Sequence, residues 1–372
     1  MKRWVPLLAI AFCLGVESAY GEDPSRLSAF APWVDTLTVS SDLRLRHESF
    51  LKNPEPDRHR QRFRLRLGSE WGIGDFSIGL RLASGTGETT STNQSFDSLF
   101  SQKAFWIDRV YLRWEAAPWL SATFGKMPNP FFTTALGDGV WDSDINPEGF
   151  AEQITWAISE RSTLFFRLGQ FVLDEDSSDN NDPWLLAQQI GGTIKPDART
   201  AFTLAVGYLD FVNATAGNLG GTVQEGNTRD ATGTLVYPFR VLHVVAETST
   251  QAGSLPVVIS ADYIKNLSDP ETGKGTGFDV GLRLGKAKSP NSWEVSYLYK
   301  RLEDDATAAD LADSDFGDGG TNRKGHILSG AWQVTSWGQA KATVYLTQVE
   351  DETRPPGRDD IHRVQLDWIM KF

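Results

Sequence analysis

The sequence predicts a transmembrane antiparallel up-and-down β-barrel of about 16 strands, with short periplasmic turns and long extracellular loops. Three observations predict this all-β fold: a secretory signal at the N-terminus, apolar and polar residues that alternate along most of the chain, and connections that are alternately short and long. Alternation with a period of two is the pattern of strands with one apolar and one polar face.

The first residues have the features of a cleaved secretory signal. Lys2 and Arg3 precede the apolar run Trp4–Val16, which is too short to cross a bilayer as a helix, and cleavage is expected after Gly21. Cleavage there removes Cys13, the single cysteine, so disulfides and thiolate metal sites are not expected.

Three segments are therefore predicted. Residues 1–21 are the signal peptide, 22–35 are a short periplasmic segment, and 36–372 are the barrel. The bulk composition agrees with this organisation. Mean hydropathy is −0.31, and no later segment offers ~18 consecutive apolar residues for a spanning helix. A closed barrel is the other structure that satisfies its backbone in lipid.

The C-terminal residues give the sharpest strand signal. Counting back from the end, every second residue is apolar: Phe372, Met370, Trp368, Leu366 and Val364. A terminal strand that ends in Phe372 resembles those of Gram-negative outer-membrane proteins, which the barrel assembly machinery recognises. An edge strand of a soluble sheet is the alternative, but an unpaired edge at a chain end promotes aggregation.

The alternating pattern recurs along the chain. The candidate strands are near 36–50, 59–71, 75–84, 103–116, 119–127, 149–159, 162–173, 184–195, 199–211, 238–250, 255–266, 276–287, 291–304, 323–336, 339–350 and 359–372. The longer connections are 52–58, 85–102, 128–148, 174–183, 212–237, 267–275, 305–322 and 351–358. A soluble β-sandwich or propeller also alternates, but its strands average nearer ~6 residues.

Alternation also predicts which side chains face the lumen. An arginine on the lipid face at midplane costs ~2–4 kcal/mol, so the arginines between apolar neighbours must point inward. This predicts a basic ladder along one wall of the lumen: Arg44, Arg46, Arg62, Arg64, Arg66, Arg81, Arg109 and Arg113.

The loop 128–148 supplies candidate partners for that ladder. Its acids are Asp138, Asp142, Asp144 and Glu148. If the loop folds into the barrel, these carboxylates face the arginines and create a transverse field that favours polar solutes. The alternative is that the loop is an external lid and the arginines only balance buried carboxylates such as Glu48. The acids of the other loops, including those of 305–322, are expected to be solvated.

Seven stretches resemble the putative porin family of Gram-negative bacteria. They are LTVSSDLRLRHE, RHRQRFRLRLG, GLRLASG, STNQSFDSLFSQKAFWIDRVYLRWE, FGKMPNPFF, VWDSDINPEG and SADYIKN. The resemblance covers nearly the whole mature chain, and its most specific part is Ser91–Gly149. It implies a channel in the cell outer membrane for passive diffusion. It implies no catalytic residues, cofactor or metal, and it leaves the preferred solute open.

Other functions are weaker. A barrel enzyme needs a nucleophile, a histidine and an acid held together, and no local motif surrounds any serine. A gated receptor needs ~22 strands and a plug, and a fatty-acid channel would not have a charged lumen. A substrate-specific channel for small anions or other polar nutrients stays open. The expected partners are outer-membrane lipid and lipopolysaccharide, small hydrophilic solutes and, by analogy, two further copies in a homotrimer. A net charge of −12 argues against nucleic acid.

Overall fold

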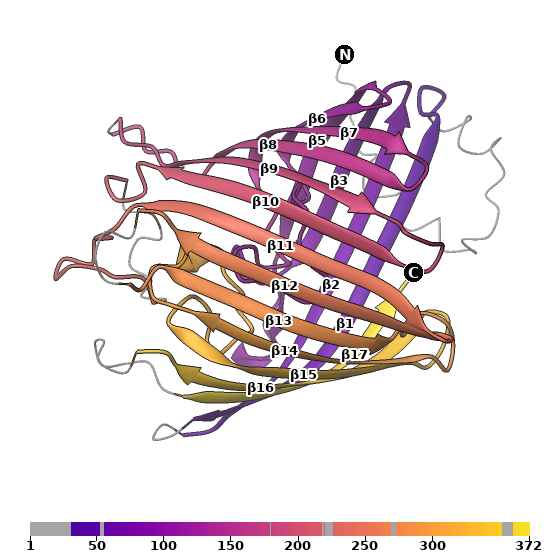
Figure 1. Ribbon diagram of the computed structural model, residues 1–372. Helices are drawn as coiled ribbons and strands as arrows, with labels where there is room; N and C mark the ends of the chain where they lie inside the picture. The colour runs from indigo at the N-terminus through magenta and orange to yellow at the C-terminus, as the bar shows by residue number, and fades with distance from the viewer. Residues whose placement is uncertain are drawn as a thin grey trace, which may run out of the picture.

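The computed structural model of the protein describes residues 31–52, 56–178, 180–217, 219, 226–268, 273–351 and 360–372. Within these residues, sixteen long strands form one closed antiparallel barrel (Figure 1). The predicted signal peptide, 1–21, and most of the predicted segment 22–35 lie outside the described residues. No helix in the described part of the chain is long and apolar enough to cross a membrane.

The strand limits agree with the predicted ones to within a few residues. The long strands are β1 (Thr36–Lys52), β2 (Arg58–Ile73), β3 (Phe76–Ser84), β5 (Phe105–Ala117), β6 (Leu120–Lys126), β7 (Glu148–Ser159), β8 (Ser162–Val172), β9 (Trp184–Ile194), β10 (Ala201–Val212), β11 (Phe239–Ala252), β12 (Leu255–Asn266), β13 (Thr276–Gly285), β14 (Trp293–Leu302), β15 (Arg323–Gln333), β16 (Gly338–Val349) and β17 (Ile361–Lys371). A further short strand, β4 (Gln94–Ser95), pairs with β2 beyond the end of β3. The predicted fold class is confirmed.

The barrel closes between its first and last strands. Each long strand pairs with its neighbours in the chain, and β1 pairs with β17 in a register that sets Leu43 opposite Met370 and Arg46 opposite Asp367. This pairing satisfies the backbone of both terminal strands, so neither is left as an open edge.

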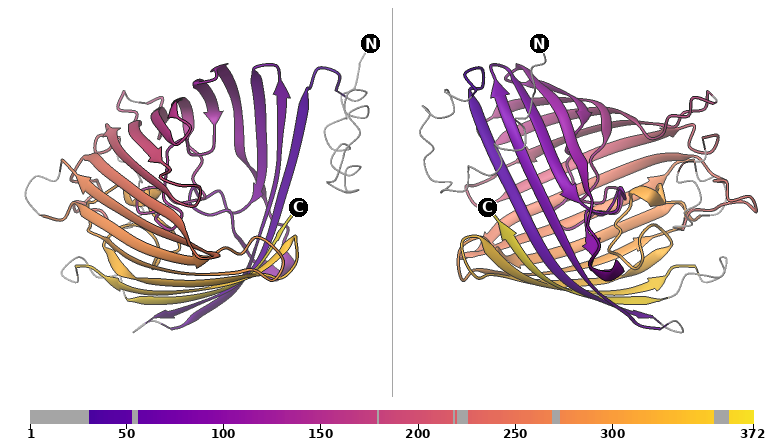
Figure 2. Two further views of the ribbon diagram at one scale, coloured as in Figure 1. Left: turned by 45° about the vertical axis from the view of Figure 1, so that its right-hand side comes forward. Right: turned by 180° about the vertical axis from the view of Figure 1, so that it is seen from behind.

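Short and long connections lie at opposite ends of the barrel. The short turns and the C-terminus are at the right-hand end of Figure 1, and the longer loops are at the left-hand end. The loop between β6 and β7 and the loop between β14 and β15 do not project outward. Both turn back inside the ring of strands, as the two views of Figure 2 show.

The outer face is apolar along the strands. On β10, Phe202, Leu204 and Val206 are 47%, 55% and 39% exposed, whereas the intervening Ala205 is 1% exposed. Exposed tryptophans lie near strand ends: Trp114, Trp119, Trp184, Trp293, Trp332 and Trp337. Outer-membrane barrels carry such an apolar band with aromatic girdles at both interfaces.

Candidate functional site

Six of the predicted arginines form cross-strand pairs of like charge on the inner wall. The pairs are Arg44–Arg64, Arg46–Arg62 and Arg81–Arg109. Like charges directly opposite one another destabilise a sheet. Carboxylates or other acceptors must therefore compensate this wall, and the question is where in the chain they originate.

The first compensating carboxylates come from the barrel strands themselves. Asp42 of β1 accepts hydrogen bonds from Arg64 at 2.8 Å and Arg66 at 2.6 Å. Asp367 of β17 accepts two hydrogen bonds from Arg46, at 2.7 and 2.9 Å. Such charge-assisted bonds fix the direction of each guanidinium group.

Glu48 is the centre of a second group of arginines. It is fully buried, and its carboxylate contacts Arg60, Arg62 at 3.5 Å and Arg363 at 2.5 Å. The simpler of the two interpretations, that the arginines balance buried carboxylates such as Glu48, therefore describes the contact made by Arg62.

Loop 128–148 enters the barrel and crosses it. At one side, Asp144 accepts a hydrogen bond from Arg66 at 3.3 Å. At the opposite side, the backbone N–H of Ala135 donates to Glu247 on β11 at 2.7 Å. The loop thus connects the arginine wall to the facing strands, and it is not an external lid.

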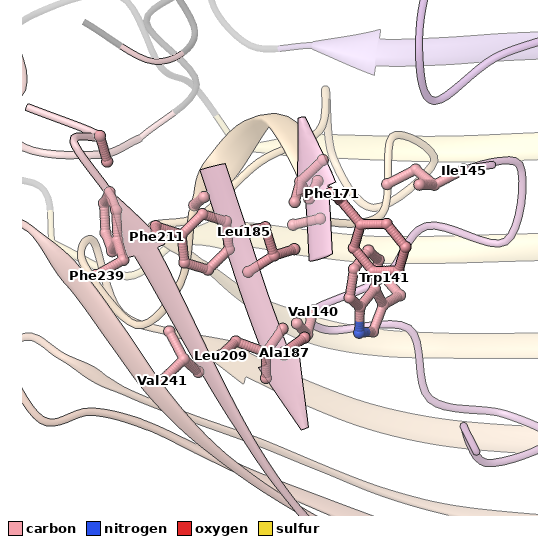
Figure 3. Close-up of a cluster of buried hydrophobic side chains, with 14 of the residues drawn as sticks. Val140, Trp141, Ile145, Phe171, Leu185, Ala187, Leu209, Phe211, Phe239 and Val241 are labelled. Atoms are coloured by element: carbon pink, nitrogen blue, oxygen red, sulfur yellow. The ribbon is translucent and has the colours of Figure 1, made fainter. Parts of the chain in front are cut away.

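Apolar packing holds the middle of this loop. Val140, Trp141 and Ile145 are at most 5% exposed and pack against inward-facing apolar residues of β8 to β11 (Figure 3). Those residues are Phe171, Leu185, Ala187, Leu209, Phe211, Phe239 and Val241. Here the inner wall is apolar because the loop covers it. The long apolar run on both faces of β10 is the sequence signal for this cover.

Asn146 links the same loop to two more ladder arginines. Its side-chain oxygen accepts from Arg109 at 2.6 Å and from Arg81 at 3.4 Å. A β-bulge in β5 shifts the register between Arg81 and Leu82. Asp108, within the bulge, is buried and contacts Arg81.

A second inward segment contacts ladder arginines of β1 and β2. Asn93 of loop 85–102 accepts from Arg44 through its side chain at 2.7 Å and from Arg62 through its backbone carbonyl at 3.2 Å. Asn93 is 3% exposed. The carbonyl and amide oxygens of this loop therefore solvate two guanidinium groups in place of water.

Two predicted site residues lie apart from this network. Arg113 lies over the ring of Tyr111, 5.7 Å from its centroid. Glu148 pairs with Lys126 at 2.6 Å, and its side chain is 63% exposed. The prediction that Glu148 faces the arginines is wrong: it is the first residue of β7 and shares the outward face of Phe150.

Three acids of the loop between β14 and β15 are buried, whereas the sequence predicted that the acids of this loop are solvated. Asp304 and Asp305 are each 1% exposed, and Asp313 is 6% exposed. This loop is rich in small apolar residues, which are buried with its carboxylates: Ala306, Ala308, Ala309, Leu311, Ala312 and Phe316. A solvated loop has no need of these residues, so their presence was the signal for an inward position.

The two inward loops bind each other. The Asp142 carboxylate accepts from the backbone N–H of Ser314 at 2.9 Å, and the Asp142 N–H donates to the carbonyl of Leu311 at 2.8 Å. Asp315 then reaches the arginine wall, 3.1 Å from Arg46 and 2.8 Å from Arg363. The second loop therefore supplies ladder partners that the sequence did not indicate.

Lys300 of β14 holds both loops to the inner wall of the barrel. Its fully buried amino group contacts Asp138 of the first loop and lies 3.0 Å from Asp313 of the second. Of the predicted loop acids, only Asp144 meets the arginine ladder. Asp138 and Asp142 face other partners.

A cavity of about 520 Å³ separates loop 128–148 from the inner face of β14 to β16. Its charged lining residues are Asp138, Asp142, Asp313, Arg109 and Lys341. Hydroxyl groups from both sides complete the lining: Thr133, Thr134, Ser143, Ser296, Ser329, Thr343 and Tyr345. The cavity is polar and bordered by both signs of charge.

Burial shifts the protonation of the loop carboxylates. Burial, together with the negative charge of Asp313, raises the pKa of Asp142 to about 8. The same two causes, opposed by Lys300, raise the pKa of Asp138 to about 7. Burial disfavours the charged form of Asp315 too, but Arg363 and Arg46 outweigh it and keep its pKa well below the usual range. The loops thus carry carboxylates of two kinds, ionised and near neutral.

Solved structures of a protein from Pseudomonas putida have a similar fold. The low-pH structure of Pseudomonas putida OprB is 10% identical, covers 94% of this chain and 96% of its own, and has a TM-score of 0.52. The high-pH structure of the same protein is 12% identical, covers 90% and 94%, and has a TM-score of 0.57. At these identities the likeness concerns the fold. No curated protein sequence matches the chain.

A comparison with protein families identifies the family of this chain. The model of the family described as putative porin matches residues 48–232 and 218–343. These ranges include β2 to β15, both inward loops and all the ladder arginines except Arg44 and Arg46. The chain therefore belongs to the putative porin family and is an outer-membrane β-barrel channel for passive diffusion.

Proposed function

We propose that small hydrophilic solutes and ions pass this porin through the cavity between loop 128–148 and the inner face of β14 to β16. The observation that carries the proposal is one polar space of about 520 Å³ that is lined both by acids of the two inward loops and by basic residues of the barrel wall. Opposed charges across a narrow wet constriction orient polar solutes and disfavour apolar ones.

In this proposal the ladder arginines have a mainly indirect role. Arg46, Arg62 and Arg64 are 5%, 7% and 8% exposed, because carboxylates and loop carbonyls surround them. They position the two loops and offset loop charge. The charged groups that a passing solute meets are the acids Asp138, Asp142 and Asp313 and the bases Lys341 of β16 and Arg109 of β5.

Reversal potentials in planar bilayers test this route. The double variant D138N/D142N, measured under a salt gradient at about pH 9, where both wild-type carboxylates are ionised, should shift selectivity toward anions relative to the wild type. D174N/D176N removes two exposed carboxylates from another loop and is the matched control. If the two variants give equal reversal potentials, the route is wrong. Neutralising Arg62, Arg64 and Arg66 together tests the ladder and should displace the loops that they hold.

A substrate-specific channel is the second candidate. The hydroxyl groups on both sides of the cavity favour it, because they can exchange hydrogen bonds with a polar solute in place of water. Liposome swelling with sugars, small anions and amino acids separates the candidates. A general porin should admit these solutes in order of size, whereas a specific channel should admit one class out of that order.

We infer that the chain is a channel and not an enzyme. Four of its histidines, His47, His59, His326 and His362, are on outward-facing positions, away from the cavity. Nucleophilic catalysis needs histidine beside a nucleophile within a site. Assays of the purified protein for lipase and protease activity test the inference, and activity above that of a vesicle blank would overturn it.

The proposed partners follow from the outer surface. The apolar band and its tryptophans suit lipid and lipopolysaccharide, and β17 suits the barrel assembly machinery. Phe96, Leu99 and Phe100 are 60%, 94% and 102% exposed. Their exposure supports a homotrimer in which a neighbouring copy covers them. Analytical ultracentrifugation in detergent tests this: a monomer would contradict it.

A further inference from the structure

Two basic residues that line the cavity of about 520 Å³ have no carboxylate in contact. Lys341 of β16 makes no hydrogen bond or ion pair through its ammonium group within the part of the chain that the structure describes. Arg109 of β5 donates a hydrogen bond to the neutral side chain of Asn146, at 2.6 Å. Asp367 lies opposite Lys341 on β17, but both of its oxygens accept hydrogen bonds from Arg46, at 2.7 and 2.9 Å. Lys341 and Arg109 therefore keep charge that a ligand in the cavity can meet.

The acids that line the same cavity do have partners. Asp138 and Asp313 both contact the buried ammonium group of Lys300. The Asp142 carboxylate accepts from the backbone N–H of Ser314 at 2.9 Å. Each acid of the cavity is thus already held by a donor, whereas the two basic groups are available.

Hydroxyl groups lie on the wall beside Lys341. Thr343 is two residues farther along β16, so it faces the same side of the sheet. Ser329 of β15 is its direct cross-strand partner, and the two hydroxyl oxygens are 3.2 Å apart. Ser296 of β14 continues the row as the partner of Ser329, and all of these residues line the cavity. Such a row of hydroxyls can donate hydrogen bonds to an anion.

We propose that Lys341, Ser329 and Thr343 form a subsite that binds an oxyanion group, a carboxylate or a phosphate, of a solute inside the cavity. The lysine ammonium group is a donor of three hydrogen bonds and accepts none. Charge-assisted hydrogen bonds to carboxylate or phosphate are about twice as strong as bonds between neutral groups. A cavity of about 520 Å³ also has the size of a site for a small ligand, ~300–1,000 Å³.

This subsite rests on the proposed solute route and names the class of solute that the route prefers. Conduction needs binding that is favourable enough for entry but weak enough for release. The subsite combines one full positive charge with neutral hydroxyls, which suits brief binding. Small oxyanions should therefore cross faster than neutral solutes of the same size at low concentration, and their flux should saturate.

Chloride conductance in planar bilayers, with inorganic phosphate added in steps at a fixed KCl concentration, tests the subsite. The measurement is made at about pH 6, where Asp138 and Asp142 are mostly protonated. Phosphate should lower the wild-type conductance along a saturating curve, because a bound oxyanion occupies the path of chloride. Acetate in place of phosphate shows which of the two oxyanions is held more tightly.

Variants of Lys341 locate the effect. K341Q should raise the half-blocking concentration of phosphate at least ~10-fold, because it removes a charged hydrogen-bond donor. K341R should keep most of the block. K195Q removes an exposed lysine from the turn between β9 and β10, so it is the matched control and should give the wild-type curve.

The hydroxyl variant S329A/T343A separates a subsite from attraction at long range. It removes no charge, so a lysine that only attracts anions from a distance predicts the wild-type curve. The subsite predicts a half-blocking concentration about 3- to 10-fold higher, because two hydrogen-bond donors are lost. The inference is overturned if phosphate does not lower the wild-type conductance, or if either K341Q or S329A/T343A gives the wild-type curve.

Phosphorus NMR of inorganic phosphate, mixed with the full-length protein in detergent, detects binding without conduction. The wild type should broaden the phosphate signal, and K341Q should not. That result supports the subsite even if D138N/D142N and D174N/D176N give equal reversal potentials and the solute route is wrong. If those reversal potentials differ, while neither phosphate measurement depends on Lys341, the subsite is wrong and the route stands.

Discussion

Arg66 donates a hydrogen bond to Asp144 at 3.3 Å, although the two residues are 78 positions apart in the chain. This contact joins the basic wall of the barrel to the loop that crosses it. Asp42 shares the same guanidinium group at 2.6 Å. Arg66 therefore has a strand partner that forms with the sheet and a loop partner that forms only when the loop enters.

A double-mutant cycle should show that the hydrogen bond between Arg66 and Asp144 contributes to stability. We expect Asp144→Asn and Arg66→Gln to be coupled by about 1 kcal/mol, the usual size for residues in one hydrogen-bonded network. Urea unfolding of the protein in lipid vesicles measures the coupling. The pair Asp144 and Arg113, which make no described contact with each other, is the control and should be additive. Additivity at Asp144 and Arg66 would show that the contact is not formed in the membrane.

Ion selectivity should depend on pH. Because the pKa of Asp138 is raised to about 7 and that of Asp142 to about 8, both carboxylates lose protons as the pH rises through this range. The cavity then becomes more negative, and cation preference should increase from pH 6 to pH 9. Reversal potentials across this range measure it. D138N/D142N should show a flatter profile, and an equally steep one would contradict the assignment.

The same raised pKa values predict the direction in which folding stability changes with pH. A carboxyl group whose folded pKa is raised above its usual value retains a proton that the unfolded chain releases. The folded state therefore loses stability as the pH rises from about 4, the unfolded value, to about 8, the folded value of Asp142. Asp142→Asn should reduce this loss in urea unfolding followed by tryptophan fluorescence. A wild type with constant stability across the range would contradict the raised pKa.

Trp141→Ala should release the middle of loop 128–148. Truncation of a buried tryptophan costs about 3–5 kcal/mol when the surroundings stay in place. Trp141 is 5% exposed and lies 5.7 Å from the ring of Phe131. We expect a lower free energy of unfolding and a larger single-channel conductance. Trp119→Ala, at a site 47% exposed on the outer face, should leave conductance unchanged. Equal conductance for Trp141→Ala and the wild type would show that the loop does not depend on this anchor.

An arginine introduced on the outer face should impair insertion. Leu204 is 55% exposed on β10, and Leu204→Arg should cost ~2–4 kcal/mol if it lies near the bilayer midplane. Thr203→Arg, one residue away on the inner face, should cost much less. Folding into vesicles, followed by the gel shift of the unheated barrel, compares the two. If both variants lose folding efficiency to a similar extent, lipid does not contact the Leu204 face of β10 in preference to the Thr203 face.

The strands and their faces were predictable because each strand carries the information within itself. In β17, Leu366 is 51% exposed while Arg363 and Asp367 are buried, as the alternation of that segment predicts. Lipid outside and a polar interior impose a period of two on every strand. The arginine ladder followed from the same rule, since an arginine between two leucines has only one acceptable direction.

The destinations of the loops were decided by the tertiary structure. Asp315 meets Arg46 across 269 positions, and Asp142 meets Ser314 across 172. Glu148 faces outward because β7 begins at this residue, and Asp108 faces inward because it lies in the β-bulge of β5. Alternation is a local response to two solvents, so the sequence alone determined it. Loop positions depend on charges and apolar surfaces that meet only after the barrel has closed, and no local pattern records which distant partner each carboxylate will find.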